Sequence, residues 1–277
     1  MVERVLDVYE VRGSSPLPPT LRLASLSQCK HWARRSVSFE PEAFRAEWPE
    51  IIEGLQFMES EKTIYEDNDL LVINKPAGMN SDDFPKRVHR LDKDTSGILL
   101  IAKNDQALEF FQKEFKERKV EKKYTALVVG NLKNEKGMIE TLIGRSPNDR
   151  RKQKAYLSND PKAEGKRAAI TEYKVLQRFE NHTPGDNFLP KDQNYDLIEV
   201  EPKTGRKHQI RTHLAYLNHP IAGDKLYGFK NQSCPKNLKR QFLHAGYLKI
   251  NLPSGEIKEF KSSLPGELNK VLEELKI

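Results

Sequence analysis

A charged turn that runs directly into an apolar segment is the feature that most constrains this chain. Residues His89-Arg90-Leu91-Asp92-Lys93-Asp94-Thr95-Ser96-Gly97 place acids beside fixed cations, and Ile98 to Ala102 follow without a polar side chain. A short apolar run bounded by turn residues predicts a strand. The acids would lie at the mouth of that strand, where neighbouring positive charge keeps a carboxylate ionised and able to act as nucleophile or base. Asp92 is therefore the first catalytic candidate.

Other interpretations of this turn compete with a catalytic one. Asp92 and Asp94 can cap local backbone amides, which is the common use of Asp before Thr-Ser-Gly. The Asp-x-Asp spacing is similar to the nucleophile loop of phosphotransferases, but that loop follows an apolar strand and here the charged His89-Arg90 come first. The run Asp94 to Gly97 resembles half of an aspartic-protease dyad, and the chain has no second half. The segment alone leaves capping and catalysis open.

A second segment, Lys203 to Gly228, combines a glycine turn, a helix and another turn. Ile210, Leu214 and Leu217 recur there at helical spacing, which predicts a stripe facing the core. Arg211 lies beside this stripe, so its guanidinium would leave the helix at the edge of the core. An arginine there can pair with a carboxylate through a planar, two-pronged contact that lysine cannot make. Without further context, an arginine on an amphipathic helix is usually a solvated flank.

Five ordered motifs relate the chain to a known family. They are the His89 to Gly97 loop with its strand, Lys122-Lys123-Tyr124-Thr125-Ala126, Thr204 to His213, His219 to Gly228, and Leu243-His244-Ala245. This order resembles that of the RluA-type pseudouridine synthases, which isomerise uridine within RNA. Five motifs in the right order are far more specific than any one of them.

The resemblance implies a role for each matching residue. Asp92 would be the catalytic aspartate, Arg211 the partner that keeps it ionised and oriented, and Tyr124 the ring that stacks on the target base. Arg90 would fill the space left by the extruded nucleotide. Flipping a nucleotide out of a stack costs about a few kcal/mol, of which an aromatic platform returns about 1–3 kcal/mol. The reaction moves the C1′ bond from N1 to C5 and needs one carboxylate and a closed pocket, with no metal or cofactor.

The expected site also includes residues that contact the RNA and histidines that form hydrogen bonds. In isolation, Tyr124 would be read as a packed strand residue with its hydroxyl at the surface, and only the motif assigns it to the site. His208, His213 and His219 have no neighbouring Cys and no His-Glu-x-x-His spacing, so we interpret them as hydrogen-bonding residues and expect no metal. We expect the following residues to contact substrate RNA: His89, Arg90, Thr95, Arg150, Arg151, Lys152, Arg206, His208, Gln209, Ile210 and Leu248.

Charge supports an RNA partner. The chain holds 47 lysines and arginines against 40 acidic residues, a net charge of +7. The excess is concentrated in residues 150–167, with seven basic and two acidic side chains. Asn, Asp, Pro and Gly in this stretch predict an exposed loop. Such a loop is usually only a solvated surface, but beside an RNA-modifying core we expect it to contact phosphates.

Cysteine content and hydropathy bound the compartment. Cys29 and Cys234 form no disulfide framework and fit a reducing environment. No apolar run approaches the roughly 18 residues of a membrane span, and the N-terminus lacks the layout of a secretory signal. We therefore expect a soluble, cytoplasmic protein without a membrane partner. We also expect a monomer.

Two domains are expected. Residues 1–60 differ from the rest in their Ser14 to Pro19 run and in holding both tryptophans. Many relatives begin with an S4-type RNA-binding domain, but its pattern is missing here. We predict a nonstandard extension over 1–60 that packs on the core or touches RNA, and a catalytic domain over 61–277.

The catalytic domain is predicted to be α+β. Asn104 can cap a helix whose apolar face holds Leu108, Phe111 and Phe115. Many strands with few crossover helices favour a mostly antiparallel sheet, and the family's fold is a long curved sheet of this kind, split by a catalytic cleft and flanked by helices. The predicted strands are Leu70 to Asn74, Gly97 to Ala102, Tyr124 to Val129, Met138 to Ile143, Ala169 to Leu176, Tyr195 to Glu201 and Phe242 to Ile250.

One departure from the family concerns the segment before the catalytic loop. Only ten residues separate the Asn74 to Gly78 turn from His89, where relatives have a longer insertion. We expect the shortening to affect RNA selectivity rather than chemistry. The sequence predicts an enzyme that isomerises specific uridines in ribosomal or transfer RNA. The alternative is an RNA-binding chaperone that keeps the fold without essential turnover.

Overall fold

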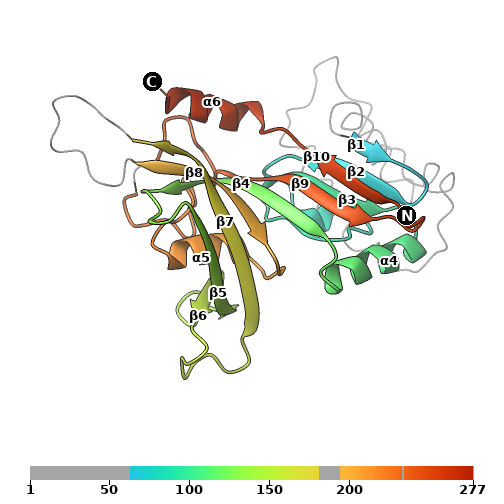
Figure 1. Ribbon diagram of the computed structural model, residues 1–277, viewed down its shortest axis with the longest axis horizontal. Coiled ribbons are helices and arrows are strands. Elements are labelled where there is room, and N and C mark those ends of the chain that lie inside the picture. Colours follow the sequence, from blue (N-terminus) through green and yellow to red (C-terminus); the bar gives the residue numbers. More distant parts are fainter. Residues whose placement is uncertain (1–62, 181–193, 233, 277) are drawn as a thin grey trace, which may run out of the picture. The chain divides into compact units, whose positions relative to one another are not determined.

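The computed structural model describes residues 63–180, 194–232 and 234–276. Within these residues, ten strands form one sheet that is accompanied by three α-helices and one 3-10 turn (Figure 1). The helices are α4 (Asp105–Lys116), α5 (Gln209–Tyr216) and α6 (Gly266–Glu274), and the 3-10 turn is η3 (Ser81–Asp83). The strands are β1 (Thr63–Glu66), β2 (Leu70–Lys75), β3 (Ser96–Ala102), β4 (Glu121–Val129), β5 (Lys136–Arg145), β6 (Gln153–Tyr156), β7 (Arg167–Phe179), β8 (Tyr195–Pro202), β9 (Leu243–Asn251) and β10 (Ile257–Lys261).

The sheet is mostly antiparallel, which confirms the expected α+β class. Its strands follow the order β1-β2-β3-β9-β4-β8-β7-β5-β6, and β10 pairs with the other part of β9. Among the described strands, the parallel pairing is that of β3 with β9, where Ser96 lies opposite His244 and Gly97 opposite Ala245. This short pairing joins the strand that follows Asp92 to the centre of the sheet.

All seven strands predicted from the sequence are present, but five further elements were missed: β1, η3, β6, β10 and α6. Strand β6 lies inside the basic segment 150–167, so the prediction of an exposed loop is wrong for Gln153–Tyr156. This strand pairs with β5, and Ala155 and Tyr156 are buried. Its four residues are too few for a strand pattern to be recognised among the surrounding charges. The predicted extension 1–60 lies outside the described residues.

Local sequence explains the helix that leads away from the catalytic strand. The Asn104 side chain accepts a hydrogen bond from the Ala107 amide at 2.8 Å, which caps α4 as predicted. Phe111 is fully buried, and Leu108 and Phe115 pack against the same core. The apolar face of α4 thus covers β3 beside the catalytic turn.

No helix in the described part of the chain is both long enough and apolar enough to span a membrane.

Two apolar clusters hold the sheet on either side of its middle strands. One gathers side chains of β4, β8, α5 and α6, and the other those of β2, β3, β10 and α4. Strand β9 belongs to both, because Leu243 packs in the first cluster and Leu248 in the second. The turn before β3 and the start of α5 are therefore fixed by separate cores that β9 links.

Gly97 makes this link possible. A Cβ atom at this position would lie 2.3 Å from the Ala245 carbonyl oxygen, and its φ of +118° is in the region that side chains disfavour. Only glycine therefore fits where β3 passes β9 at the end of the catalytic turn.

Candidate active site

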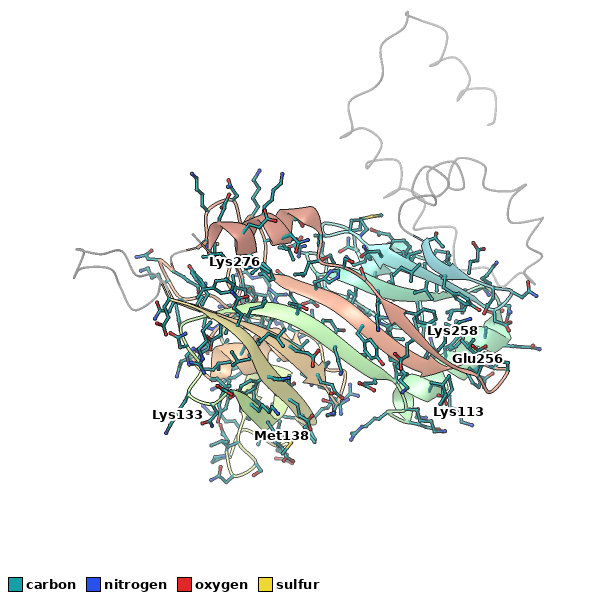
Figure 2. The ribbon with its side chains drawn as sticks, turned by 45° about the horizontal axis from the view of Figure 1, so that its top comes forward. Lys113, Lys133, Met138, Glu256, Lys258 and Lys276 are labelled. Atoms are coloured by element: carbon teal, nitrogen blue, oxygen red, sulfur yellow. The ribbon has the colours of Figure 1, made fainter. Side chains whose placement is uncertain are left out.

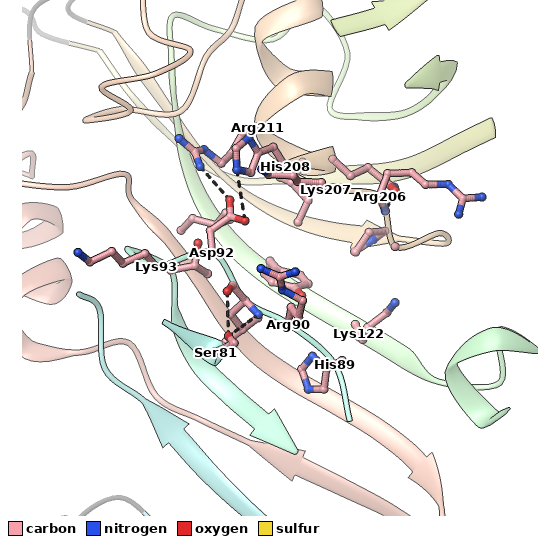
Figure 3. A pocket seen from close by; sticks show the side chains of 18 of the residues that line it. Ser81, His89, Arg90, Asp92, Lys93, Lys122, Arg206, Lys207, His208 and Arg211 are labelled. Carbon is pink, nitrogen blue, oxygen red and sulfur yellow. Dashed lines mark hydrogen bonds and ion pairs between the residues drawn. The ribbon is translucent and has the colours of Figure 1, made fainter. Parts of the chain in front are cut away.

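A cavity of about 1240 Å³ lies beside the turn that leads into β3. Its walls come from the His89 to Thr95 turn, the first half of β4, the loop between β8 and α5, and α5 itself (Figure 3). Fourteen lysines and arginines line it against three aspartates, so its electrostatic field attracts polyanions. The volume exceeds the roughly 300–1,000 Å³ typical of small-molecule pockets, which suits a larger ligand.

Asp92 and Arg211 meet inside this cavity, although 119 residues separate them in the chain. The Arg211 Nη1 atom donates to Asp92 Oδ2 at 2.9 Å (Figure 3). The Asp92 side chain is 24% exposed, whereas that of Arg211 is 8% exposed. An anion is thus held by a fixed cation while remaining open to a ligand.

The two-pronged contact of Arg211 forms with Asp224, while Asp92 receives a single hydrogen bond. Arg211 donates to Asp224 through Nε at 2.7 Å and through Nη2 at 2.8 Å. Burial disfavours the Arg211 charge, but the hydrogen bonds and charges of Asp224 and Asp92 outweigh burial and raise its pKa. Burial likewise opposes the Asp224 charge, yet the Arg211 hydrogen bond leaves the pKa of Asp224 below its usual value. Sequence reasoning assigned Asp224 no role, although it lies in the quoted His219 to Gly228 motif.

Side chains from other elements hold every residue of the catalytic turn from Leu91 to Ser96. Hydrogen bonds to backbone atoms hold three of these residues, and bonds to side chains hold the others. This preorganisation fixes the direction of the Asp92 carboxylate before a ligand arrives. The pairs are Ser81 with Leu91, Arg211 with Asp92, Lys75 with Lys93, Arg240 with Asp94, Gln241 with Thr95, and His244 and Arg240 with Ser96.

Two buried cations in this set were not predicted. Lys75 is fully buried, and its Nζ donates to the carbonyl oxygens of Pro76, Met79 and Lys93. Burial lowers the pKa of Lys75 to about 8. Arg240 donates from Nη1 to the Asp94 carbonyl at 3.0 Å and pairs with Glu267 of α6. Lys75 belongs to the Asn-Lys-Pro-x-Gly turn seen in the sequence, while Arg240 lies in none of the quoted motifs.

His208 lies on the other side of the Asp92 carboxylate. Its Nε2 is 3.8 Å from Asp92 Oδ1, and its Nδ1 is 2.9 Å from the Tyr227 hydroxyl. That hydroxyl accepts from the Gln153 amide at 2.6 Å and has its own proton to donate to Nδ1. Burial lowers the pKa of His208. This arrangement allows a neutral imidazole to keep its proton on Nε2, facing Asp92.

Tyr124 lines the same cavity from β4 and is half-buried. Its backbone is fixed from both sides, opposite Val200 of β8 and Ala245 of β9. Burial, followed by the charge of Asp92, raises the pKa of Tyr124, so the ring stays neutral. The structure therefore places the three predicted catalytic residues, Asp92, Arg211 and Tyr124, around one cavity.

Known proteins are similar to this chain in sequence. The sequence profile of RNA pseudouridylate synthases matches residues 81–216. An RNA pseudouridine synthase of Bacillus subtilis is 35% identical over 240 residues, which cover 76% of this chain and 72% of that protein. The chain belongs to the RluA-type family of pseudouridine synthases. A ribosomal large subunit pseudouridine synthase of Borreliella burgdorferi is 36% identical over 73% of the chain, but the match covers only 64% of that protein.

The fold agrees with this family. The human protein RNA pseudouridylate synthase domain containing 4 superimposes with a TM-score of 0.65 at 25% identity. The superposition covers 82% of this chain and 98% of the human one. The described sheet and helices therefore form a pseudouridine synthase fold.

Four other residues expected to contact RNA also line the cavity of this RluA-type protein: Arg90, Arg151, Arg206 and His208. The Arg90 side chain is 67% exposed and donates to Asp82 at 3.1 Å. His89 also borders the cavity, but its ring stacks on Phe115 at 4.8 Å and accepts from the Leu100 amide. Burial lowers the pKa of His89 to about 3, so this imidazole supplies no positive charge.

The remaining expected RNA contacts are not supported by their placement. Thr95, Gln209 and Ile210 border the cavity but are at most 6% exposed, and the polar side chains of the first two bond protein groups. Leu248 is 2% exposed and belongs to the core. Arg150 and Lys152 do not line the cavity. Thr95, Gln209 and Ile210 thus lie at the cavity with little exposed surface, whereas Leu248, Arg150 and Lys152 do not line it.

The other two histidines of interest bond protein groups in different places. His213 is fully buried between Thr141 and Thr171, and His219 Nδ1 lies 2.9 Å from the Val129 carbonyl oxygen. Among the described residues, no group of three or more His, Cys, Asp or Glu side chains is arranged to hold a metal ion.

Proposed function

We propose that this protein isomerises specific uridines to pseudouridine in RNA, with Asp92 as the catalytic residue. The observation that carries the proposal is the Asp92–Arg211 pair at 2.9 Å, inside a cavity with fourteen basic residues. The pair holds a carboxylate against a fixed cation, and the cavity supplies the field that draws in a polyanionic strand. Membership of the RluA-type family supports the same reaction.

The chemistry needs no group beyond those of the chain and the substrate. The C1′–N1 bond breaks, the uracil turns, C1′ joins C5, and the C5 proton is lost while N1 gains one. Asp92 can begin this sequence by attack at C1′, by attack at the uracil ring, or by removing a proton from C2′. In each route Arg211 and the fixed turn hold the carboxylate at the reacting nucleoside.

Base flipping is part of the proposal, because a base stacked in RNA cannot reach the half-buried Asp92. Tyr124 is neutral and faces the same cavity, so its ring suits stacking on uracil, a contact worth about 1–3 kcal/mol. The exposed Arg90 at the rim suits the gap that the nucleotide leaves. These two contacts offset the cost of about a few kcal/mol for unstacking.

We propose ribosomal RNA as the first target to examine and transfer RNA as the second. The names of the relatives support this order, since the Borreliella relative is a ribosomal large subunit enzyme. The test is a transcriptome-wide map of pseudouridine in a strain lacking the gene, followed by complementation with wild type or with Asp92→Asn.

We expect discrete pseudouridines to vanish on deletion, to return with the wild-type gene, and to stay absent with Asp92→Asn. A map that is unchanged by deletion would contradict the proposal. If Asp92→Asn restores the growth of the deletion strain to the wild-type rate while the pseudouridines stay absent, the result would instead support the RNA chaperone.

A further inference from the structure

Three arginines from separate elements converge on one part of the cavity. Arg118 lies between α4 and β4, Arg167 is the first residue of β7, and Arg206 lies between β8 and α5. We call them the arginine trio. Within the described residues, no carboxylate lies at ion-pair distance from any of the three. By contrast, the cavity cations Arg151 and Lys203 are paired with acids.

Arg206 is anchored without being neutralised. Arg206 Nε donates to the Ala168 carbonyl at 2.9 Å, which fixes the guanidinium next to Arg167 and leaves its Nη atoms to other acceptors. Burial, and then the charges of Arg167 and Arg118, lower the pKa of Arg206. Like charges held this close repel each other, so an anion that binds among them relieves the repulsion.

The backbone directs Arg118 into this group. Its φ of +61° is left-handed, and its amide donates to the Phe115 carbonyl at 3.3 Å. This conformation ends α4 and turns the chain towards β4, at a position where glycine is common. An arginine here places a charged side chain at the wall of the cavity instead.

We propose that Arg118, Arg167 and Arg206 form a binding site for a backbone phosphate of RNA. Guanidinium groups match phosphate oxygens through paired N–H donors, and three of them can surround one phosphate. The site lies apart from the reacting nucleotide, because the Arg206 side chain extends away from Asp92 along the cavity (Figure 3). The phosphate therefore belongs to a nucleotide other than the target uridine, and the trio sets the path of the strand. This inference rests on the proposed RNA substrate.

The test compares two triple variants in an Asp92→Asn background, which prevents turnover. One replaces each arginine of the trio by glutamine, and the control replaces Lys113, Lys133 and Lys276 by glutamine. The control lysines are labelled in Figure 2 and do not line the cavity. Within the described residues, no acidic side chain lies at ion-pair distance from them. Binding of a fluorescein-labelled 12-nucleotide oligouridylate is followed by fluorescence anisotropy over a range of KCl concentrations.

Losing one phosphate contact should lower the slope of log affinity against log salt by about 0.7 for a single strand. We expect at least this change, with about tenfold weaker binding near 0.1 M KCl, for the trio variant, and no change for the control. If Arg206→Gln perturbs folding, the double variant Arg118→Gln/Arg167→Gln is used instead, because both positions are exposed. Its salt slope and its RNA affinity should both fall, as in the triple variant. Slopes equal to that of the control would overturn the site.

A second arm separates RNA from free phosphate compounds. Thermal unfolding is measured with inorganic pyrophosphate at constant ionic strength. If only the trio variant loses a pyrophosphate-dependent rise in melting temperature while its RNA salt slope stays at the control value, the assignment to RNA is overturned. Failure of pseudouridine formation by the wild-type chain would refute the proposed function without changing the pyrophosphate result, so the two failures are distinguishable.

Discussion

Replacing Asp224 by alanine tests whether the Arg211 side chain is held by its buried partner. The Asp224 side chain is fully buried, and its oxygens accept two bonds from Arg211 and two from the Leu226 and Tyr227 amides. Removing one member of a buried pair costs about 3–5 kcal/mol, because the other charge is left without its partner. The remaining contact of Arg211 with Asp92 places the expected loss at the lower end, about 3 kcal/mol.

Urea unfolding measures this loss, and Asp149→Ala is the matched control. Asp149 pairs at 2.9 Å with Arg151, whose side chain is 78% exposed, so its removal should lower stability far less than the removal of Asp224. We expect the urea midpoint of Asp224→Ala to fall by about 1 M or more. The dependence of the unfolding free energy on urea concentration should stay unchanged. A midpoint as high as that of Asp149→Ala would refute the account of the buried pair.

The pH dependence has a definite sign. The folded pKa of Asp224 lies below its usual 3.8, so its stabilising contribution is complete above about pH 4 and is lost as the pH falls through the folded value. Asp224→Ala should therefore lose stability relative to wild type at pH 7, and this difference should shrink on acidification below pH 4. A difference that grows as the pH falls would contradict the direction of the shift.

Three further predictions concern the catalytic turn and the basic segment. Because the pKa of Lys75 is about 8, its deprotonation removes one of the three donors that hold the carbonyls of Pro76, Met79 and Lys93, and kcat should fall as the pH rises through this value. Lys75→Met should have a lower kcat without this alkaline decrease, and an identical decrease in the variant would exclude Lys75. Arg240→Met frees the Asp94 carbonyl and should lower kcat by up to about 10²-fold with little change in KM; a rise in KM alone would contradict this. Neutralising Arg150, Arg151 and Lys152 should lower the RNA salt slope by at most about 0.7, since only Arg151 lines the cavity, and a loss of about 2 would show that all three contact phosphates.

Sequence reasoning located the site because its chemistry lies in motifs with recognisable spacing. The Asp92 turn, Tyr124 and Arg211 were all found in this way, and the apolar runs predicted seven strands. Strand β6 was missed because its four residues lie among charges, and tertiary burial rather than pattern determines it. The periodicity of residues 210–217 gave the helix that carries Arg211.

Contacts between distant segments could not be predicted from sequence motifs. The partner of a guanidinium depends on which carboxylates the fold brings close, so the role of Asp224 emerged only from the structure. Arg240 acts through backbone carbonyls, and such acceptors occur at every residue and leave no sequence signal. The burial of Leu248 and Gln209 also follows from tertiary packing, which the motifs do not show.

The central claim is that the Asp92 carboxylate carries out the chemistry while the surrounding cations bind RNA. The most direct measurement incubates purified wild-type protein and Asp92→Asn with total RNA from the deletion strain and counts pseudouridine at each restored position, alongside the affinity of each protein for the same RNA. We expect Asp92→Asn to bind within about threefold of wild type, because the substitution removes an anion from a cationic cavity. We expect it to restore no pseudouridine, because the carboxylate is gone. Restoration by Asp92→Asn at the wild-type rate would contradict the claim.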